Sequence, residues 1–162
     1  MTELLVVMFI LSLLSSTVLV GYRSGQKRYS LYQTAQRLAS DIRRVQNMAI
    51  SGVNITGNYY GYGVYAVVGE TSYLIYGDTN NSFDYQPTDS VIETVYLPDR
   101  IRIKETFPNS GKTDVFFKPP QPQTFVNGNN LAGSIATITS EIIGDSLTKS
   151  VIVTTAGLIE VK

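Results

Sequence analysis

The chain lacks histidine, cysteine and tryptophan altogether, and only 16% of its 162 residues are charged. Without cysteine there is no disulfide, no thiol nucleophile and no thiolate metal ligand, and without histidine there is no imidazole base or ligand. The sequence also holds no Gly-x-Ser-x-Gly segment and no phosphate-binding loop. We therefore expect that the protein is not an enzyme and requires no cofactor.

Proline, glycine and negative charge are scarce in the first 51 residues. This segment has no proline, two of the 13 glycines, and six basic residues against two acidic ones, for a net charge of +4. Residues 52–162 hold all six prolines and have a net charge of −4, so the whole chain is neutral. The contrast predicts two unlike domains, 1–51 and 52–162.

Charge is entirely absent from the 19 residues Leu4–Tyr22. A helix of that length is about 28 Å long, close to the roughly 30 Å hydrocarbon core of a bilayer. We expect residues 4–22 to form a transmembrane or filament-core helix in contact with the lipid bilayer. A signal peptide is less favoured because no basic n-region precedes this long run, and a buried core helix because five turns carry no charge.

Apolar residues recur at steps of three and four in the next segment, as on one face of an α-helix. Gly52 is placed to end that helix. The pattern predicts an amphipathic stalk over residues 23–51 that packs against the rest of the chain. The packing residues are Leu31, Ala35, Leu38, Ile42, Val45 and Ala49.

After Gly52 the apolar period changes from 3.6 to 2, which is typical of strands. The expected fold class is α+β: a long N-terminal helix, membrane-spanning in its first half, packed on a C-terminal antiparallel β-sheet or β-sandwich headgroup. A loop over 77–90 and a tight turn at Ala156-Gly157 separate some of the strands. The expected strands are 59–68, 72–76, 91–97, 101–105, 114–117, 134–142, 149–154 and 158–162.

The loop after Gly77 carries oxygen ligands at alternate positions, namely Asp78, Asn80 and Asp84. Carboxylate and amide oxygens suit Ca²⁺, so a calcium site is one hypothesis. The alternative is an Asx-rich surface turn in which these side chains bind their own backbone, because the sharp-turn glycine and a bidentate glutamate are missing.

Basic residues alternate at Arg100, Arg102 and Lys104, so one strand face would present all three. Such a stripe suits nucleic-acid phosphates. The alternative is an ordinary solvated face, which the negative charge of the second domain favours. Nucleic acid is therefore the less favoured partner.

Glu3 is the one acid at the head of the uncharged run. An acid beside a membrane helix is costly unless it is paired. One interpretation is that Thr2 caps the helix while Glu3 complements its dipole. The other assigns Glu3 a role in assembly.

The segment Thr2–Leu11, Thr-Glu-Leu-Leu-Val-Val-Met-Phe-Ile-Leu, resembles the start of type IV pilins and type II secretion pseudopilins. The resemblance implies that Glu3 pairs with the N-terminal amine of a neighbouring subunit. It also implies other pilin or pseudopilin subunits and an inner-membrane assembly platform as partners. The residues implied in assembly are Thr2, Glu3, Leu4, Leu5, Val6 and Val7.

The order of motifs in the second domain resembles the GspH/FimT group of minor pilins and pseudopilins. These motifs are Gly63-Val64-Tyr65, Tyr73–Tyr76, Phe117-Lys118-Pro119 and the terminal hairpin Val153–Val161. The resemblance implies a structural subunit in the inner membrane whose headgroup is periplasmic or extracellular. The alternatives are a minor pilin that binds DNA for uptake and a signal-anchored surface domain that never polymerises.

The sequence departs from that family at its start, because the basic leader, the glycine and Phe-Thr are absent and Met1 stands where leucine is usual. A start codon assigned inside the gene, or a trimmed chain, would explain this, and a leader upstream would make prepilin peptidase a partner. The basic residues Arg23, Lys27 and Arg28 follow the apolar run and by themselves favour a cytoplasmic second domain. The resemblance implies the opposite orientation.

Overall fold

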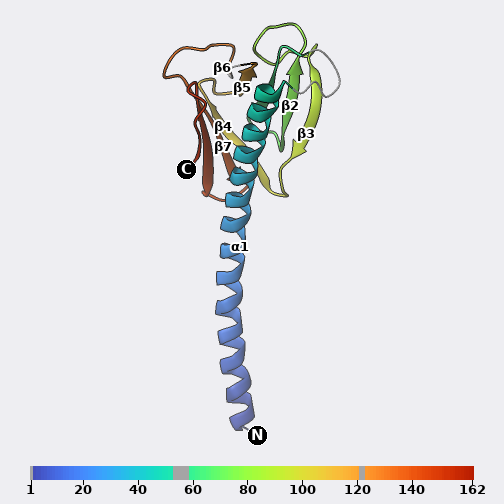
Figure 1. Cartoon of the computed structure of the whole chain (residues 1–162). Coiled ribbons are helices and arrows are strands. Elements are labelled where there is room, and N and C mark those ends of the chain that lie inside the picture. Colours follow the sequence, from blue (N-terminus) through green and yellow to red (C-terminus); the bar gives the residue numbers. More distant parts are fainter. Residues whose placement is uncertain (1, 53–58, 121–122) are drawn as a thin grey trace. The chain divides into compact units, whose positions relative to one another are not determined.

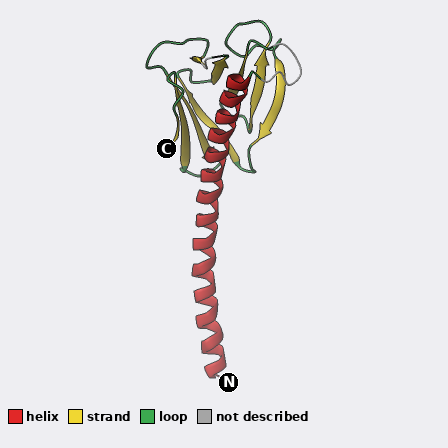
Figure 2. Cartoon of the chain, viewed as in Figure 1, coloured by secondary structure: helices red, strands yellow, loops and turns green. Residues whose placement is uncertain are grey.

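The computed structural model describes residues 2–52, 59–120 and 123–162, without the side chains of residues 17–21, 23 and 24. Within this described part, one helix precedes nine strands (Figures 1 and 2). The elements are α1 (Thr2–Ser51), β1 (Gly61–Val67), β2 (Ser72–Asp78), β3 (Ser90–Tyr96), β4 (Ile101–Phe107), β5 (Lys112–Lys118), β6 (Gln123–Val126), β7 (Ile135–Ile142), β8 (Thr148–Thr154) and β9 (Ile159–Val161).

The strands form two antiparallel sheets. One has five strands in the order β3-β2-β1-β5-β6, and the other has four in the order β4-β7-β8-β9. In the five-stranded sheet Val64 lies opposite both Ile75 and Val115, and in the four-stranded sheet Ile138 lies opposite Val151. The prediction of an α+β fold with antiparallel sheets is confirmed.

The strand β6 was not predicted from the sequence. It pairs with β5, placing Phe125 opposite Phe116. Three prolines, Pro119, Pro120 and Pro122, precede it, and proline removes a backbone donor and favours turns. The predicted loop over 77–90 was too long at both ends, because β2 continues to Asp78 and β3 begins at Ser90.

The helix α1 ends where Gly52 takes a left-handed conformation with φ of 61°. Its N–H donates to the Ala49 carbonyl at 3.4 Å, as in a glycine-terminated helix. The chain nevertheless divides into compact units within α1, at Met1–Ser30 and Leu31–Lys162, whereas we predicted a boundary after residue 51. The second half of the helix belongs to the headgroup unit because its apolar stripe is buried there.

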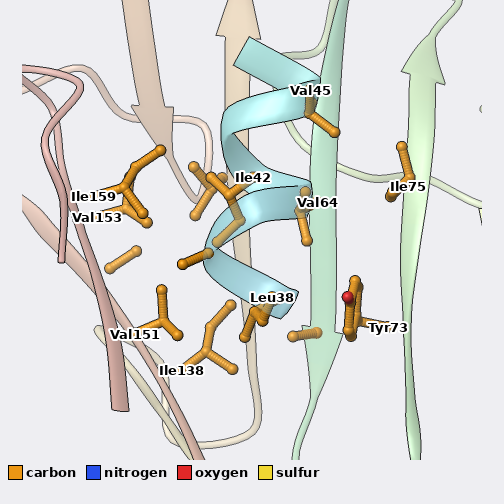
Figure 3. Packing of buried hydrophobic residues seen from close by; sticks show 14 of the residues in the cluster. Leu38, Ile42, Val45, Val64, Tyr73, Ile75, Ile138, Val151, Val153 and Ile159 are labelled. Atoms are coloured by element: carbon orange, nitrogen blue, oxygen red, sulfur yellow. The ribbon is translucent and has the colours of Figure 1, made fainter. Parts of the chain in front are cut away.

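The core of the headgroup lies between the two sheets and is built around α1. Figure 3 shows Leu38, Ile42 and Val45 reaching from the helix toward side chains of both sheets. All six predicted packing residues are at most 2% exposed, and full burial of a leucine, isoleucine or valine side chain contributes about 1.5–3 kcal/mol. The partners labelled in Figure 3 are Val64, Tyr73, Ile75, Ile138, Val151, Val153 and Ile159.

Polar contacts fix the helix on both sides of this core. The Tyr73 hydroxyl donates to Asp41 at 2.6 Å, and burial together with this bond raises the pKa of Tyr73. Arg44 reaches Glu93 of β3 at 2.7 Å, while Arg43 donates to the Ile159 carbonyl of β9 at 3.1 Å. These bonds set the rotation of α1 against each sheet.

Candidate functional site

The first part of α1 presents a row of large apolar side chains to its surroundings. Ten of these residues are between 50% and 69% exposed, and we call them the apolar surface of α1. A contiguous apolar surface of this kind marks contact with a membrane or with other protein. Its members are Leu4, Leu5, Val6, Val7, Met8, Phe9, Ile10, Leu11, Leu13 and Leu14.

The side chains of Thr2 and Glu3, at the start of the same helix, are exposed. Among the helical residues with described side chains, no stretch is both long and apolar enough to cross a membrane. Residues 17–21 of the predicted span fall outside those described side chains, and the span stays a prediction.

A second, unpredicted feature lies on the face of the five-stranded sheet that points away from α1. Side chains alternate along a strand, so Tyr65 of β1 and Asp114 of β5 point away from the core that holds Val64 and Val115. Gly63 makes room for rings on this outer face, because a Cβ there would lie 2.5 Å from the ring of Tyr76.

The loop between β2 and β3 covers this outer face with aromatic side chains. Phe83 stacks on Phe125 with ring centroids 4.8 Å apart. Tyr85 packs against Tyr65 at 4.5 Å and against Tyr76 at 5.2 Å. The five-stranded sheet therefore has an apolar core on one face and a smaller aromatic layer on the other.

Asp114 is the buried acid at the centre of this layer, with 3% of its surface exposed. The Tyr76 hydroxyl lies 2.9 and 2.8 Å from the two carboxyl oxygens, and the Tyr85 N–H donates to one of them. Burial raises the pKa of Asp114 to about 8, against the lowering effect of these two bonds. The carboxyl group is therefore largely protonated at neutral pH.

A cavity of about 230 Å³ opens beside Asp114. Strands β1 and β5 contribute Tyr65, Lys112 and Asp114 to its lining. The loop between β2 and β3 adds Asp84 and Tyr85. Turns on either side of β5 and β6 complete the wall with Asn109 and Asn127. We call this cavity the outer-face pocket.

The residues predicted to bind calcium contact other groups of the protein or line the outer-face pocket. Asp78 is fully buried and accepts the N–H groups of Asn80 and Asn81 at 2.9 and 2.7 Å. The Asn80 side-chain amide donates to Gln86, and Asp84 lines the outer-face pocket. The described residues contain no group of three or more carboxylates placed to hold a metal ion. This geometry fits the Asx-turn alternative, and calcium binding stays a prediction.

The basic residues predicted to bind nucleic acid are not all on one strand. Arg100 precedes β4 and has a positive φ of 68°, so it does not continue the strand that carries Arg102 and Lys104. Arg102 and Lys104 are exposed on β4, and both pair with Glu141 of β7, at 2.8 and 3.6 Å. The hydrogen bond from Arg102 lowers the pKa of Glu141. One acid thus offsets part of the charge, and nucleic-acid binding stays a prediction.

Sequence reasoning did not single out the outer-face pocket. Asp114 was predicted only as part of a strand, and Asn127 lay outside every predicted element. The sequence feature that could have indicated it is the alternation of Lys112, Asp114 and Phe116, together with the glycines at 61 and 63 in another predicted strand. That pattern indicates an outer face with its own packing, but it does not reveal the loop that covers it.

In comparisons with known proteins, no family model, no curated protein and no solved structure matches this chain.

Proposed function

We propose that the protein is a structural subunit, a minor pilin or pseudopilin, of a type IV pilus or a type II secretion pseudopilus. In this proposal Leu4–Tyr22 holds the chain in the inner membrane, the headgroup lies on the periplasmic side, and the subunit is later packed into a helical filament. The single observation that carries the proposal is the apolar surface of α1, from Leu4 to Leu14, which stays exposed.

The apolar surface of α1 is not part of the core that stabilises the headgroup. The headgroup unit begins at Leu31 and buries its own helical stripe, with Ile42 and Val45 at 0% exposure. Leaving ten large apolar side chains in water is unfavourable, so lipid or other helices must cover them. Lipid contacts in the membrane would be exchanged for helix–helix packing in the filament.

Glu3 would set the register of that packing. A carboxylate among apolar helices needs a cation within hydrogen-bond distance, and removing one partner of such a buried pair costs about 3–5 kcal/mol. The N-terminal amine of a neighbouring subunit is the cation proposed here. The other proposed partners are the assembly platform and, where a leader is present, prepilin peptidase.

The experiment that tests the proposal is recovery of the epitope-tagged chain in filaments sheared from its host cells. We expect the wild-type chain in the sheared fraction and a loss of about tenfold or more for Glu3→Ala at an equal level in membranes. Glu160→Ala is the matched control, because Glu160 is an exposed acid of the headgroup. Equal recovery of Glu3→Ala would contradict the role of Glu3, and absence of the wild-type chain from filaments would contradict the proposal as a whole.

A further inference from the structure

We propose that the outer-face pocket is a binding site for a neutral saccharide. The pocket lies in the headgroup, on the side of the five-stranded sheet opposite α1, and it is independent of the proposed role of α1 in a filament.

The lining of the pocket matches hydroxyl groups, which both donate and accept hydrogen bonds. The Lys112 ammonium only donates, the Asp84 carboxylate only accepts, and the Asn109 side-chain amide does both. A ligand that is only a donor or only an acceptor would leave part of this wall unsatisfied. A sugar carries several hydroxyl groups in fixed directions and can bind all three.

The charge of the pocket favours a neutral ligand. Asp84 and Lys112, which carry opposite charges, both line the pocket. The burial that raises the pKa of Asp114 to about 8 leaves that carboxyl group largely neutral at pH 7. A phosphate or carboxylate ligand would meet Asp84, and an ammonium ligand would meet Lys112, so an ion of either sign gains little here.

Two tyrosines supply the apolar part of the wall. The rings of Tyr65 and Tyr85 pack together with centroids 4.5 Å apart, and both residues line the pocket. Binding sites commonly combine such aromatic surface with a few placed polar groups. Tyr65 also borders a neighbouring hollow of about 260 Å³, which leaves space for a second sugar unit.

Several non-glycine residues around the pocket have a positive φ. Asn127, in the pocket wall, has a positive φ of 48°, and its buried Nδ2 has no hydrogen-bond partner among the described residues. Asn81 and Phe83, in the covering loop, also have positive φ. Strained non-glycine residues are costly and gather at functional sites. Hydrogen bonds hold these conformations in place: the Asn127 N–H donates to the Asp114 carbonyl at 3.0 Å, and the Asn81 N–H donates to Asp78 at 2.7 Å.

The test is a titration of the full chain in a detergent without a sugar headgroup. Ligand-observed NMR monitors the binding. The probes are glucose, galactose, mannose, N-acetylglucosamine, maltose and lactose, with inorganic phosphate and methylammonium as charged probes. We expect saturable binding of at least one sugar with a dissociation constant of about 1–10 mM, because so small a ligand gains little free energy per atom.

Two pocket variants and two matched controls locate the binding. Asn109→Ala and Lys112→Ala remove exposed side chains from the pocket, and each should weaken sugar binding about tenfold. Asn130→Ala and Lys162→Ala remove exposed side chains of the same types elsewhere and should leave binding unchanged. The proposal is overturned if no sugar binds saturably, if the pocket variants bind as the wild type does, or if phosphate or methylammonium binds more tightly than every sugar.

Discussion

Leu11 and Ile42 belong to the same helix and have similar side chains, yet Leu11 is 56% exposed and Ile42 is fully buried. Leu11 lies in the unit Met1–Ser30 and Ile42 in the unit Leu31–Lys162. The second unit satisfies its own apolar residues by packing two sheets around its part of the helix. The first unit leaves its large apolar residues exposed. The buried apolar residues of the second unit stabilise the fold, whereas the exposed apolar residues of the first unit would serve in assembly.

The largest expected effect distinguishes the two units by stability. Ile42→Ala removes a fully buried side chain between the sheets and should lower the free energy of unfolding by about 2–5 kcal/mol. Leu11→Ala should change it by about 0.5 kcal/mol or less, because its side chain takes no part in the core. Urea unfolding of the full chain in micelles, followed by near-ultraviolet circular dichroism of its tyrosines, measures both.

Similar losses for Ile42→Ala and Leu11→Ala would break the comparison, because the first unit would then contribute to the fold. If Leu11→Ala lowered the recovery of the chain in sheared filaments and left its free energy of unfolding unchanged, the first unit would act in assembly and not in folding.

A second effect concerns pH and belongs to the second unit alone. The pKa of Asp114 is about 8 in the folded chain and about 3.9 in an unfolded one. Between these values the folded chain keeps a proton that the unfolded chain has released, so stability falls as pH rises. The contribution of Asp114 is fully present below about pH 4 and is lost as pH rises through about 8. The slope for one proton is at most about 1.4 kcal/mol per pH unit.

Thermal unfolding of the full chain between about pH 5 and pH 8 measures this slope. Asp114→Asn keeps the shape of the side chain without the titration and should flatten the dependence. Asp99→Asn, at an exposed acid, should retain it. If Asp114→Asn and wild type share one slope, Asp114 is not the group responsible.

The sequence was sufficient to predict those parts of the fold in which apolar residues recur at a regular spacing. The steps of three and four from Leu31 to Ala49 correspond to a stripe buried in the structure, and the alternation around Val64 and Val151 corresponds to paired strands. Gly52 and Gly157 mark a helix end and a hairpin turn because both need a positive φ. These features are local, so one stretch of sequence is sufficient to predict them.

The outer-face pocket depends on contacts between distant residues, and no single stretch contains it. Asp114 meets Tyr76 of another strand and Tyr85 of a loop 29 residues away. The helix itself is continuous, and the compact headgroup unit includes the part of it that begins at Leu31, where the predicted packing stripe also begins. The pairing of Arg102 with Glu141 likewise requires the register of β4 on β7.

The most direct measurement uses the absence of cysteine from the chain. Leu11→Cys and Ile50→Cys each introduce one thiol at positions of similar exposure, 56% and 51%. In spheroplasts treated with a membrane-impermeant maleimide, the account predicts rapid labelling of Ile50→Cys and protection of Leu11→Cys, because lipid or neighbouring helices cover the apolar surface of α1. Labelling of Leu11→Cys as fast as that of Ile50→Cys would show that this surface is not covered in the cell and would contradict the account.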